Sequence, residues 1–315
     1  MESGNYSKVT EFILLGLSTD PVLQIPLFQF FLIVYMTTVV GNVVLIAAVR
    51  VDTRLHKPMY LFLVNLSFVD ICYTSITVPK MLANILTVNK SISFSGCLVQ
   101  VYCFLLLVET ECVLLAFMAY DRFVAICNPL RYNTIMKSVV CVKMVSASWL
   151  TGGIISSVDI FALSHLTYCG PNTINHFFCE ATYLLQLSCS DLSLANVVKH
   201  VGSFAVLLAP LSFILYSYVN IIRAVFRIQS RRYKAFSTCV SHLIIVILFY
   251  GSALFIYMRP EHTANLADKI LSVFYTVITP MLNPIIYSLR NKDVHGALKN
   301  IGKSLSEIRY IPKKV

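Results

Sequence analysis

Four acidic side chains, Asp70, Glu109, Glu111 and Asp159, fall inside long apolar stretches of the sequence. A carboxylate near the centre of a bilayer costs roughly 2.5–3.5 kcal/mol, so each requires a partner, a proton or a water-filled cavity. We expect Asp70 to approach Glu111, and two close carboxylates cannot both stay ionised without a cation or a shared proton. Because hard cations prefer oxygen ligands, the sequence predicts either a sodium site or a protonated, hydrogen-bonded pair. Further oxygen atoms for such a site are available on Asn42, Ser67 and Asn283.

The other two acids point elsewhere. Glu109 is two residues from Glu111, which places it on the opposite side of a helix, where it either borders a ligand cavity or meets a neighbouring helix. Asp159 lies near the outer end of its apolar stretch, close to His165. Either side chain is suited to anchor a polar ligand group or to make a plain hydrogen bond at the helix end, and the sequence leaves both readings open.

A second set of polar residues indicates a conformational switch. Asp121 and Arg122 close an apolar stretch within the string M-A-Y-D-R-F-V-A-I-C (118–127). Charges at a membrane boundary are costly, so this pair indicates a latch rather than packing. Arg122 follows Glu111 by eleven residues, about three turns at 3.6 residues per turn, so both share one inward face.

Two prolines interrupt apolar stretches, Pro210 and Pro284, and each removes a helical hydrogen bond. Pro284 lies in the string P-M-L-N-P-I-I-Y (280–287), where Asn283 can satisfy freed backbone groups. Such points favour a helix with two stable shapes, although a static kink would have the same sequence.

The elements that must position these residues are membrane helices. The chain has 315 residues, 57% of them hydrophobic and 13% charged, with a mean hydropathy of +0.75. About 20 consecutive apolar residues cross a hydrocarbon core as a helix. Seven stretches qualify: 26–49, 59–78, 99–119, 142–161, 197–222, 236–258 and 270–289. The sequence therefore predicts an all-α membrane protein, a seven-transmembrane helix bundle (26–290) with an extracellular leader (1–25) and a cytoplasmic tail (291–315).

Orientation follows from the basic residues. Most of the 25 lysines and arginines flank one face of the predicted bundle, which places the N-terminus outside and the C-terminus inside. We read the net charge of +10 as this bias plus attraction to anionic membrane lipid, and not as nucleic-acid binding. No signal peptide precedes the first stretch. Val294, Leu298, Ile301 and Leu305 predict a short amphipathic helix on the inner leaflet, against the alternative of a solvated tail.

Four of the ten cysteines, Cys97, Cys169, Cys179 and Cys189, lie on the predicted extracellular side. They favour two disulfides, and spacing alone allows three pairings. The sequon at Asn5 is expected to be glycosylated, whereas the sequons at Asn65, inside a span, and Asn89, close to the membrane, are not.

Several strings in order make the chain resemble the rhodopsin-like G-protein-coupled receptors, and within them the odorant (olfactory) receptors of the tetrapod-type, class II branch. Besides the two strings above, they are P-M-Y-L-F-L-V-N-L-S-F-V-D (58–70), S-Y (217–218) and K-A-F-S-T-C-V-S-H-L (234–243). Phe123 departs from the usual tyrosine of the third-span signature, which puts one hydrogen bond in doubt.

The resemblance implies a multi-pass receptor of the plasma membrane. It would bind a small, mostly apolar volatile ligand in the outer half of the bundle and activate the stimulatory olfactory G protein, raising cyclic AMP. It pairs Cys97 with Cys179 and leaves Cys169 with Cys189. It assigns coupling and switch roles to Asp121, Arg122, Tyr218, Tyr250, Asn283, Pro284 and Tyr287. Phe104 stands where aminergic receptors keep an aspartate, so an amine held at that position is disfavoured.

Helical facing and family position together predict a ligand pocket, although ordinary bundle core would look similar. Its residues would be Phe104, Leu105, Val108, Glu109, Gly202, Ser203, Val206, Ala253, Tyr257 and Thr276. An apolar cavity with one or two polar anchors suits a small odorant.

Three other classes of protein are alternatives to this interpretation of the sequence. A transporter is disfavoured because the two halves show no repeat and no matching broken helices. An intramembrane enzyme is disfavoured because H-E-x-x-H and G-x-S-x-G motifs are missing. A receptor of the same superfamily for a non-odorant small molecule, outside the olfactory epithelium, remains the alternative. No cofactor is expected, apart from the sodium ion considered above.

Overall fold

The computed structural model describes residues 9–18, 20–169, 171–227, 232–257, 266–290, 294–297 and 299. Within them, seven helical segments are long and apolar enough to cross a membrane, as the sequence predicts. The first four are α1 (Pro21–Val51), α2 (Pro58–Leu86), α3 (Phe94–Cys127) and α5 (Ser138–Ser164). α9 (Arg232–Tyr257) is the sixth. The fold class is thus confirmed. The amphipathic tail is described only at 294–297 and 299, and Asn5 lies outside the described residues.

The fifth and seventh spans are not uninterrupted α-helices. The fifth joins α7 (Ser193–Ser203) to α8 (Ala209–Arg227) through a π-helical turn, η3 (Phe204–Leu208). The seventh joins α10 (Leu266–Val273) to α11 (Thr279–Arg290) through η4 (Phe274–Ile278), also π-helical. Pro210 lies two residues after the first of these turns and lacks an N–H to continue the ladder. π-helical turns occur mostly as single bulges at functional sites.

The helices begin where local chemistry favours it. Asp20 accepts a hydrogen bond from the Val22 N–H at 2.9 Å, and Pro21 occupies the first helical position of α1. Ser93 caps α3 through the Gly96 N–H at 3.1 Å. The short connections are η1 (Thr53–Leu55), η2 (Pro129–Arg131), α4 (Tyr132–Ile135) and α6 (Ala181–Gln186).

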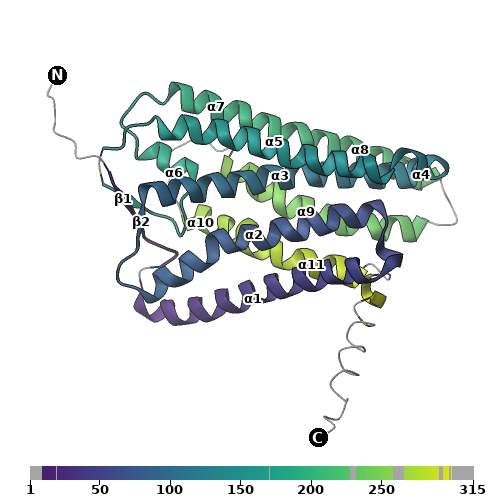
Figure 1. Cartoon of the computed structure of the whole chain (residues 1–315), viewed down its shortest axis with the longest axis horizontal. Helices are drawn as coiled ribbons and strands as arrows, with labels where there is room; N and C mark the ends of the chain where they lie inside the picture. Colours follow the sequence, from purple (N-terminus) through teal and green to yellow (C-terminus); the bar gives the residue numbers. More distant parts are fainter. Residues whose placement is uncertain are drawn as a thin grey trace, which may run out of the picture.

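α3 is the central element of the bundle, because it packs against α2, α5, α8 and α9 (Figure 1). α1 lies at the edge between α2 and α11, where Gly41 permits close approach. A Cβ on Gly41 would come within 3.2 Å of Pro284 Cγ. The large apolar side chains that face outward, such as Phe30, Leu150 and Phe226, are those a bilayer would cover.

A small sheet closes one end of the bundle. β1 (Glu11–Leu14) pairs antiparallel with β2 (Ser91–Ser93) and parallel with β3 (Thr173–Ile174), giving the order β2–β1–β3. Phe12 and Leu14 are fully buried beneath it. The sequence suggested only a polar leader here, so this strand is a finding of the structure. β1 and the last turns of α11 lie at opposite ends of the bundle (Figure 1).

Candidate functional site

A cavity bordered by α3, α5, α6, α7 and η3 lies near the sheet end of the bundle. Its volume is about 70 Å³ and its walls are mostly apolar, with side chains such as Ala162, Leu163 and Leu185. Ligand sites usually occupy about 300–1,000 Å³. A ligand must therefore enlarge this cavity by displacing side chains. The adjacent π-helical turn η3 contributes Val206 and Leu207 to the wall.

The structure brings six of the ten predicted pocket residues to this cavity: Leu105, Val108, Glu109, Gly202, Ser203 and Val206. It does not place Phe104, Ala253 or Thr276 on its wall. Tyr257 has a side chain outside the described part of the chain. Ligand contact at all ten positions remains a prediction.

Phe104 lies elsewhere because it belongs to an aromatic cluster between α2, α3 and the loop before α6. Its ring stacks on Tyr73 at a centroid distance of 5.1 Å and approaches Phe178 at 4.7 Å. Only 1% of its surface is exposed. Phe104 therefore serves as packing between helices, which is the plain core reading that the sequence allowed.

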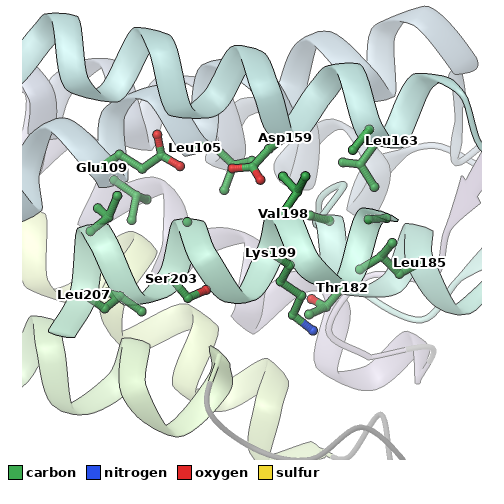
Figure 2. A pocket seen from close by; sticks show the side chains of 16 residues that line it. Leu105, Glu109, Asp159, Leu163, Thr182, Leu185, Val198, Lys199, Ser203 and Leu207 are labelled. Atoms are coloured by element: carbon green, nitrogen blue, oxygen red, sulfur yellow. The ribbon is translucent and has the colours of Figure 1, made fainter. Parts of the chain in front are cut away.

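The ten predicted pocket residues include none from α5 or α6, although the sequence left open that Asp159 anchors a polar ligand group. Asp159, Thr182 and Lys199 are its further polar lining residues (Figure 2). Asp159 had a signal, since it is an acid within a span. His165 places Nδ1 2.8 Å from the Phe161 carbonyl oxygen of its own helix, which is the helix-end hydrogen bond that the sequence allowed. Thr182 lies in the second external loop, where helical facing gives no information.

Glu109 and Asp159 form a carboxyl pair at the cavity wall. The two side chains are within hydrogen-bonding reach of each other, from α3 and α5. Glu109 is only 6% exposed, and its Oε2 atom has no hydrogen-bond donor within the described part of the chain. Gly202 of α7 faces Asp159, since a Cβ there would lie 3.9 Å from Oδ1. Both sequence-based readings of Glu109 apply, because it borders the cavity and meets a neighbouring helix.

Asp70 and Glu111 form a second carboxyl pair in the inner half of the bundle. They lie close enough to interact electrostatically, as predicted, and both are buried. The Asn283 amide donates to Oδ1 and Oδ2 of Asp70, each at 3.0 Å. Acceptor atoms still lacking a donor, as far as the structure describes the chain, are Asn42 Oδ1, Glu111 Oε1 and Asn283 Oδ1.

The inner pair has the donor set for a hard cation, since its open atoms are all oxygens. The Asn42 amide is fixed by the carbonyl oxygens of Thr38 at 3.0 Å and Pro280 at 3.2 Å. Among the residues that the structure describes, no three or more His, Cys, Asp or Glu side chains lie together so that they could hold a metal ion. The carboxylates here number two, so a bound cation would depend on neutral oxygens as well.

Three of the predicted switch residues, Arg122, Tyr218 and Tyr287, lie close together where α3, α8 and α11 meet. Tyr132 donates a hydrogen bond to Asp121 Oδ1 at 2.7 Å, which fixes the carboxyl against α4. Arg122 is 5% exposed, and its Nε has no acceptor within the described residues. The guanidinium interacts electrostatically with Tyr218 and Tyr287.

Tyr218 has a partner that sequence reasoning missed. Its hydroxyl lies 2.8 Å from Nδ1 of His242 on α9, and His242 Nε2 lies 3.1 Å from the Leu115 carbonyl oxygen on α3. A single chain of hydrogen bonds thus joins α8, α9 and α3. Tyr250 adds another link, because its hydroxyl donates to the Cys112 carbonyl oxygen at 2.9 Å.

The sheet end of the bundle is covered by the tightly packed loop between α5 and α7. Its disulfides are Cys97–Cys179 and Cys169–Cys189, the pairing that the family resemblance implies. Gln100 Oε1 accepts from the Cys179 N–H at 2.9 Å. This fixes the loop to α3.

Two titratable side chains are buried in this loop. Burial lowers the pKa of His176 to about 3, so it is neutral at pH 7. Burial also raises the pKa of Glu180 to about 7. Glu180 Oε2 lies 3.6 Å from His176 Nε2, but a neutral histidine makes no ion pair there.

Comparison with known proteins gives a consistent result. A family model described as "Olfactory receptor" matches residues 31–304. Human Olfactory receptor 1L4 is 49% identical over 305 residues, covering 96% of this chain and 98% of that protein. Rat Olfactory receptor 226 is 50% identical over 307 residues, covering 95% and 94%. Human Olfactory receptor 1D2 is 46% identical over 300 residues, covering 95% and 96%.

Among solved structures, squid rhodopsin has a similar fold, with a TM-score of 0.73. The similarity covers 91% of this chain and 87% of that one, at 18% sequence identity. At that identity the likeness concerns the arrangement of helices alone.

Proposed function

The chain belongs to the olfactory receptor family, and from that premise we propose that an odorant bound in the outer cavity activates a stimulatory G protein at the opposite end of the bundle, raising cyclic AMP. The protein is an odorant receptor and not an enzyme. What the proposal adds is the location of the ligand, the type of G protein and the residues that connect the two.

The observation that carries the proposal is that the two halves of α3 have different surroundings. Its outer half borders the apolar cavity through Leu105, Val108 and Glu109. Its inner end carries Asp121 and Arg122, buried among tyrosines of α8 and α11. A ligand that enlarges the cavity moves α3 relative to α7, and the same two spans meet again at the inner end. Such coupling requires that the ligand bind one of two shapes more tightly.

The Tyr218–His242–Leu115 chain is the contact that an outward movement of α9 would break. Its hydrogen bonds hold α9 against α3 and α8 in this structure. Breaking it would free the Tyr218 hydroxyl to approach Arg122. We also assign switch roles to Asn283, Pro284 and Tyr287 of α11, because Asn283 hydrogen-bonds to Asp70 and Tyr287 interacts electrostatically with Arg122.

The orientation in our proposal places the sheet end outside the cell and the C-terminus inside. Both disulfides lie at the sheet end, and disulfides persist in oxidising compartments. The basic residues gather at the other end, as cytoplasmic loops require, where they would also attract anionic lipid.

We also propose that the inner pair, Asp70 and Glu111, holds a sodium ion or a shared proton. The support is the set of buried oxygens without donors that surround it within the described residues. A cation or proton there would favour the shape in which Asn283 stays bound to Asp70. An agonist that favours the other shape would then weaken cation binding, and the cation would weaken agonist binding equally.

A cyclic-AMP reporter in cells, screened with a chemically broad odorant panel, tests the proposed function. Arg122→Ala should abolish the response while the receptor still reaches the cell surface. Arg54→Ala is the matched control, because Arg54 is an exposed inner arginine paired with Asp52 at 2.6 Å. A panel response that survives in Arg122→Ala would contradict the coupling route.

A further inference from the structure

The carboxyl pair at the cavity wall constrains the chemistry of the ligand. Glu109 and Asp159 approach each other from α3 and α5, and both line the cavity. The remaining lining is mostly apolar, so water cannot solvate two charges there. A hydrogen bond between two carboxyls needs a proton on one of them, so the pair must hold at least one.

Lys199 lies on the same cavity wall, on α7. Figure 2 shows its side chain extending toward Thr182, away from the two carboxyls. A positive charge in the cavity favours the form in which the pair keeps one proton and one negative charge. Lys199 also interacts electrostatically with Glu180 of the external loop, which favours its outward position.

A pair that shares its single proton internally offers only acceptor atoms to the cavity. Glu109 belongs to the cavity lining, and its buried Oε2 has no partner outside the carboxyl pair among the described residues. The opposite wall presents Gly202, whose missing side chain leaves Asp159 accessible from α7. The site is therefore an apolar cavity in which the carboxyl oxygens lack a hydrogen-bond donor.

We propose that this receptor selects small apolar ligands that carry one hydrogen-bond-donating head group, a hydroxyl or a basic amine, and that Glu109 with Asp159 binds that group. The inference rests on the proposed function only in placing the ligand in this cavity. Ethers and ketones of the same skeleton cannot donate and leave the pair unsatisfied. A carboxylate is repelled by the negative charge of the pair.

This site is distinct from the one that an amine would use at the position of Phe104. That position is filled by the aromatic cluster with Tyr73 and Phe178. The donor-binding group of this chain lies instead between α3 and α5, where the acids occur at 109 and 159.

Matched head-group series test the inference. Cyclohexanol, cyclohexylamine, methoxycyclohexane, cyclohexanone and cyclohexanecarboxylic acid share one skeleton, and the linear hexyl series provides a second. We expect the alcohol or the amine to stabilise the detergent-solubilised receptor at concentrations about tenfold lower than the ether and ketone, since hydrogen bonds to charged groups are worth about that factor. The two donor compounds show whether a neutral or a charged donor is preferred.

Glu109→Gln should reduce that donor preference toward equality, because the amide offers a donor as well as an acceptor. Glu11→Gln, at an exposed carboxyl of β1, is the matched control and should keep it. Equal or better binding of the ether or ketone, an unchanged preference in Glu109→Gln, or no stabilisation by any donor compound would overturn the inference. Preferred binding of the carboxylate would also overturn it and assign Lys199 as the anchor.

Stabilisation of the solubilised receptor does not depend on G-protein coupling, so the two proposals fail in different ways. A donor preference in thermal stability without any cyclic-AMP response would contradict the coupling and leave the ligand class intact. A cyclic-AMP response to odorants with no head-group preference would leave the function intact and contradict the ligand class.

Discussion

The two carboxyl pairs of α3 lie two residues apart in sequence and differ in nearly every physical respect. Glu111 points inward with Asp70, where the Asn283 amide donates two hydrogen bonds of 3.0 Å. Glu109 points toward α5 with Asp159, at the wall of a cavity, and keeps an oxygen without a donor among the described residues. Both pairs keep a glutamate oxygen without a donor among the described residues, Glu111 Oε1 and Glu109 Oε2. The first pair receives two hydrogen bonds from Asn283, and the second borders the cavity.

This difference teaches that a buried acid in a membrane bundle has two distinct uses. An acid held by protein donors joins helices and sets their relative positions, so its removal destabilises the fold. An acid left open toward a cavity makes the free protein less stable and the complex more stable. The following predictions would break or sharpen this distinction.

The largest effect is expected at the inner pair. Asn283→Leu removes both hydrogen bonds to Asp70 and leaves a buried carboxyl without them, at a cost of about 3 kcal/mol. Thermal melting of the solubilised receptor should show the loss. Asn65→Leu is the control, because this half-buried amide hydrogen-bonds only to Leu61 O at 2.9 Å and to Trp149 Nε1 at 3.4 Å among the described contacts. Equal losses in both variants would refute the special role of the inner pair.

Another buried acid, Glu180, accepts a hydrogen bond from the Thr182 hydroxyl and still has a raised pKa. Burial raises its pKa from 4.5 to about 7. Since its pKa is higher in the folded protein, the folded state holds more protons than the unfolded state between these values. Stability therefore falls as the pH rises from about 5 to 8, by about 2 kcal/mol.

Glu180→Gln should remove that fall, so the variant would melt at a nearly constant temperature over this range. The comparison with the unmodified receptor at each pH isolates Glu180 from His176. His176 has the opposite sign, because its pKa is lowered to about 3 and its contribution falls as the pH drops below about 6.5. An identical pH profile in both proteins would show that Glu180 is not buried.

At the outer pair a smaller effect of the opposite sign is expected. Asp159→Asn replaces one of two opposed carboxyls by an amide that can donate to Glu109. The melting temperature of the free receptor should stay the same or rise, by no more than about 1 kcal/mol in stability. A drop as large as that of Asn283→Leu would show that the outer pair is structural, and the contrast between the pairs would disappear.

The smallest effect concerns sodium. If the inner pair binds it with a dissociation constant near the sodium concentration used, 150 mM sodium chloride should stabilise the receptor by roughly 0.4 kcal/mol relative to choline chloride. Asp70→Asn should abolish this increment and Glu109→Gln should keep it. If sodium still stabilises Asp70→Asn, the inner pair does not bind the sodium ion and holds a shared proton.

The fold could be predicted from the sequence because hydropathy alone reports which stretches a bilayer can hold. The part of the cavity lining that α3 contributes could be predicted for a related reason. Leu105, Val108 and Glu109 lie on a regular helix whose faces follow from residue spacing. The small sheet could not, because four residues of β1 carry little pattern and their partners come from two distant loops.

The predicted pocket residues that do not line this cavity also have physical reasons for lying elsewhere. Phe104 faces the bundle as predicted, but aromatic rings from three other residues, Tyr73, Phe178 and Tyr275, fill the space around it. His242 was overlooked because a histidine within an apolar stretch gives no hint of which helices it will join. Thr276 was assigned to the cavity by regular helical facing, and it lies within the π-helical turn η4, where that facing does not apply.

The two π-helical turns have a consequence for mutational scanning. An α-helix rotates by about 100° per residue, and one additional residue in a turn offsets everything that follows by that angle. A single helical wheel drawn through Ser193–Arg227 therefore assigns wrong faces to one side of η3. Mutational scans of this span need one helical wheel for the residues before Phe204 and a second wheel for those after the turn. The span that contains η4 needs the same division at Phe274.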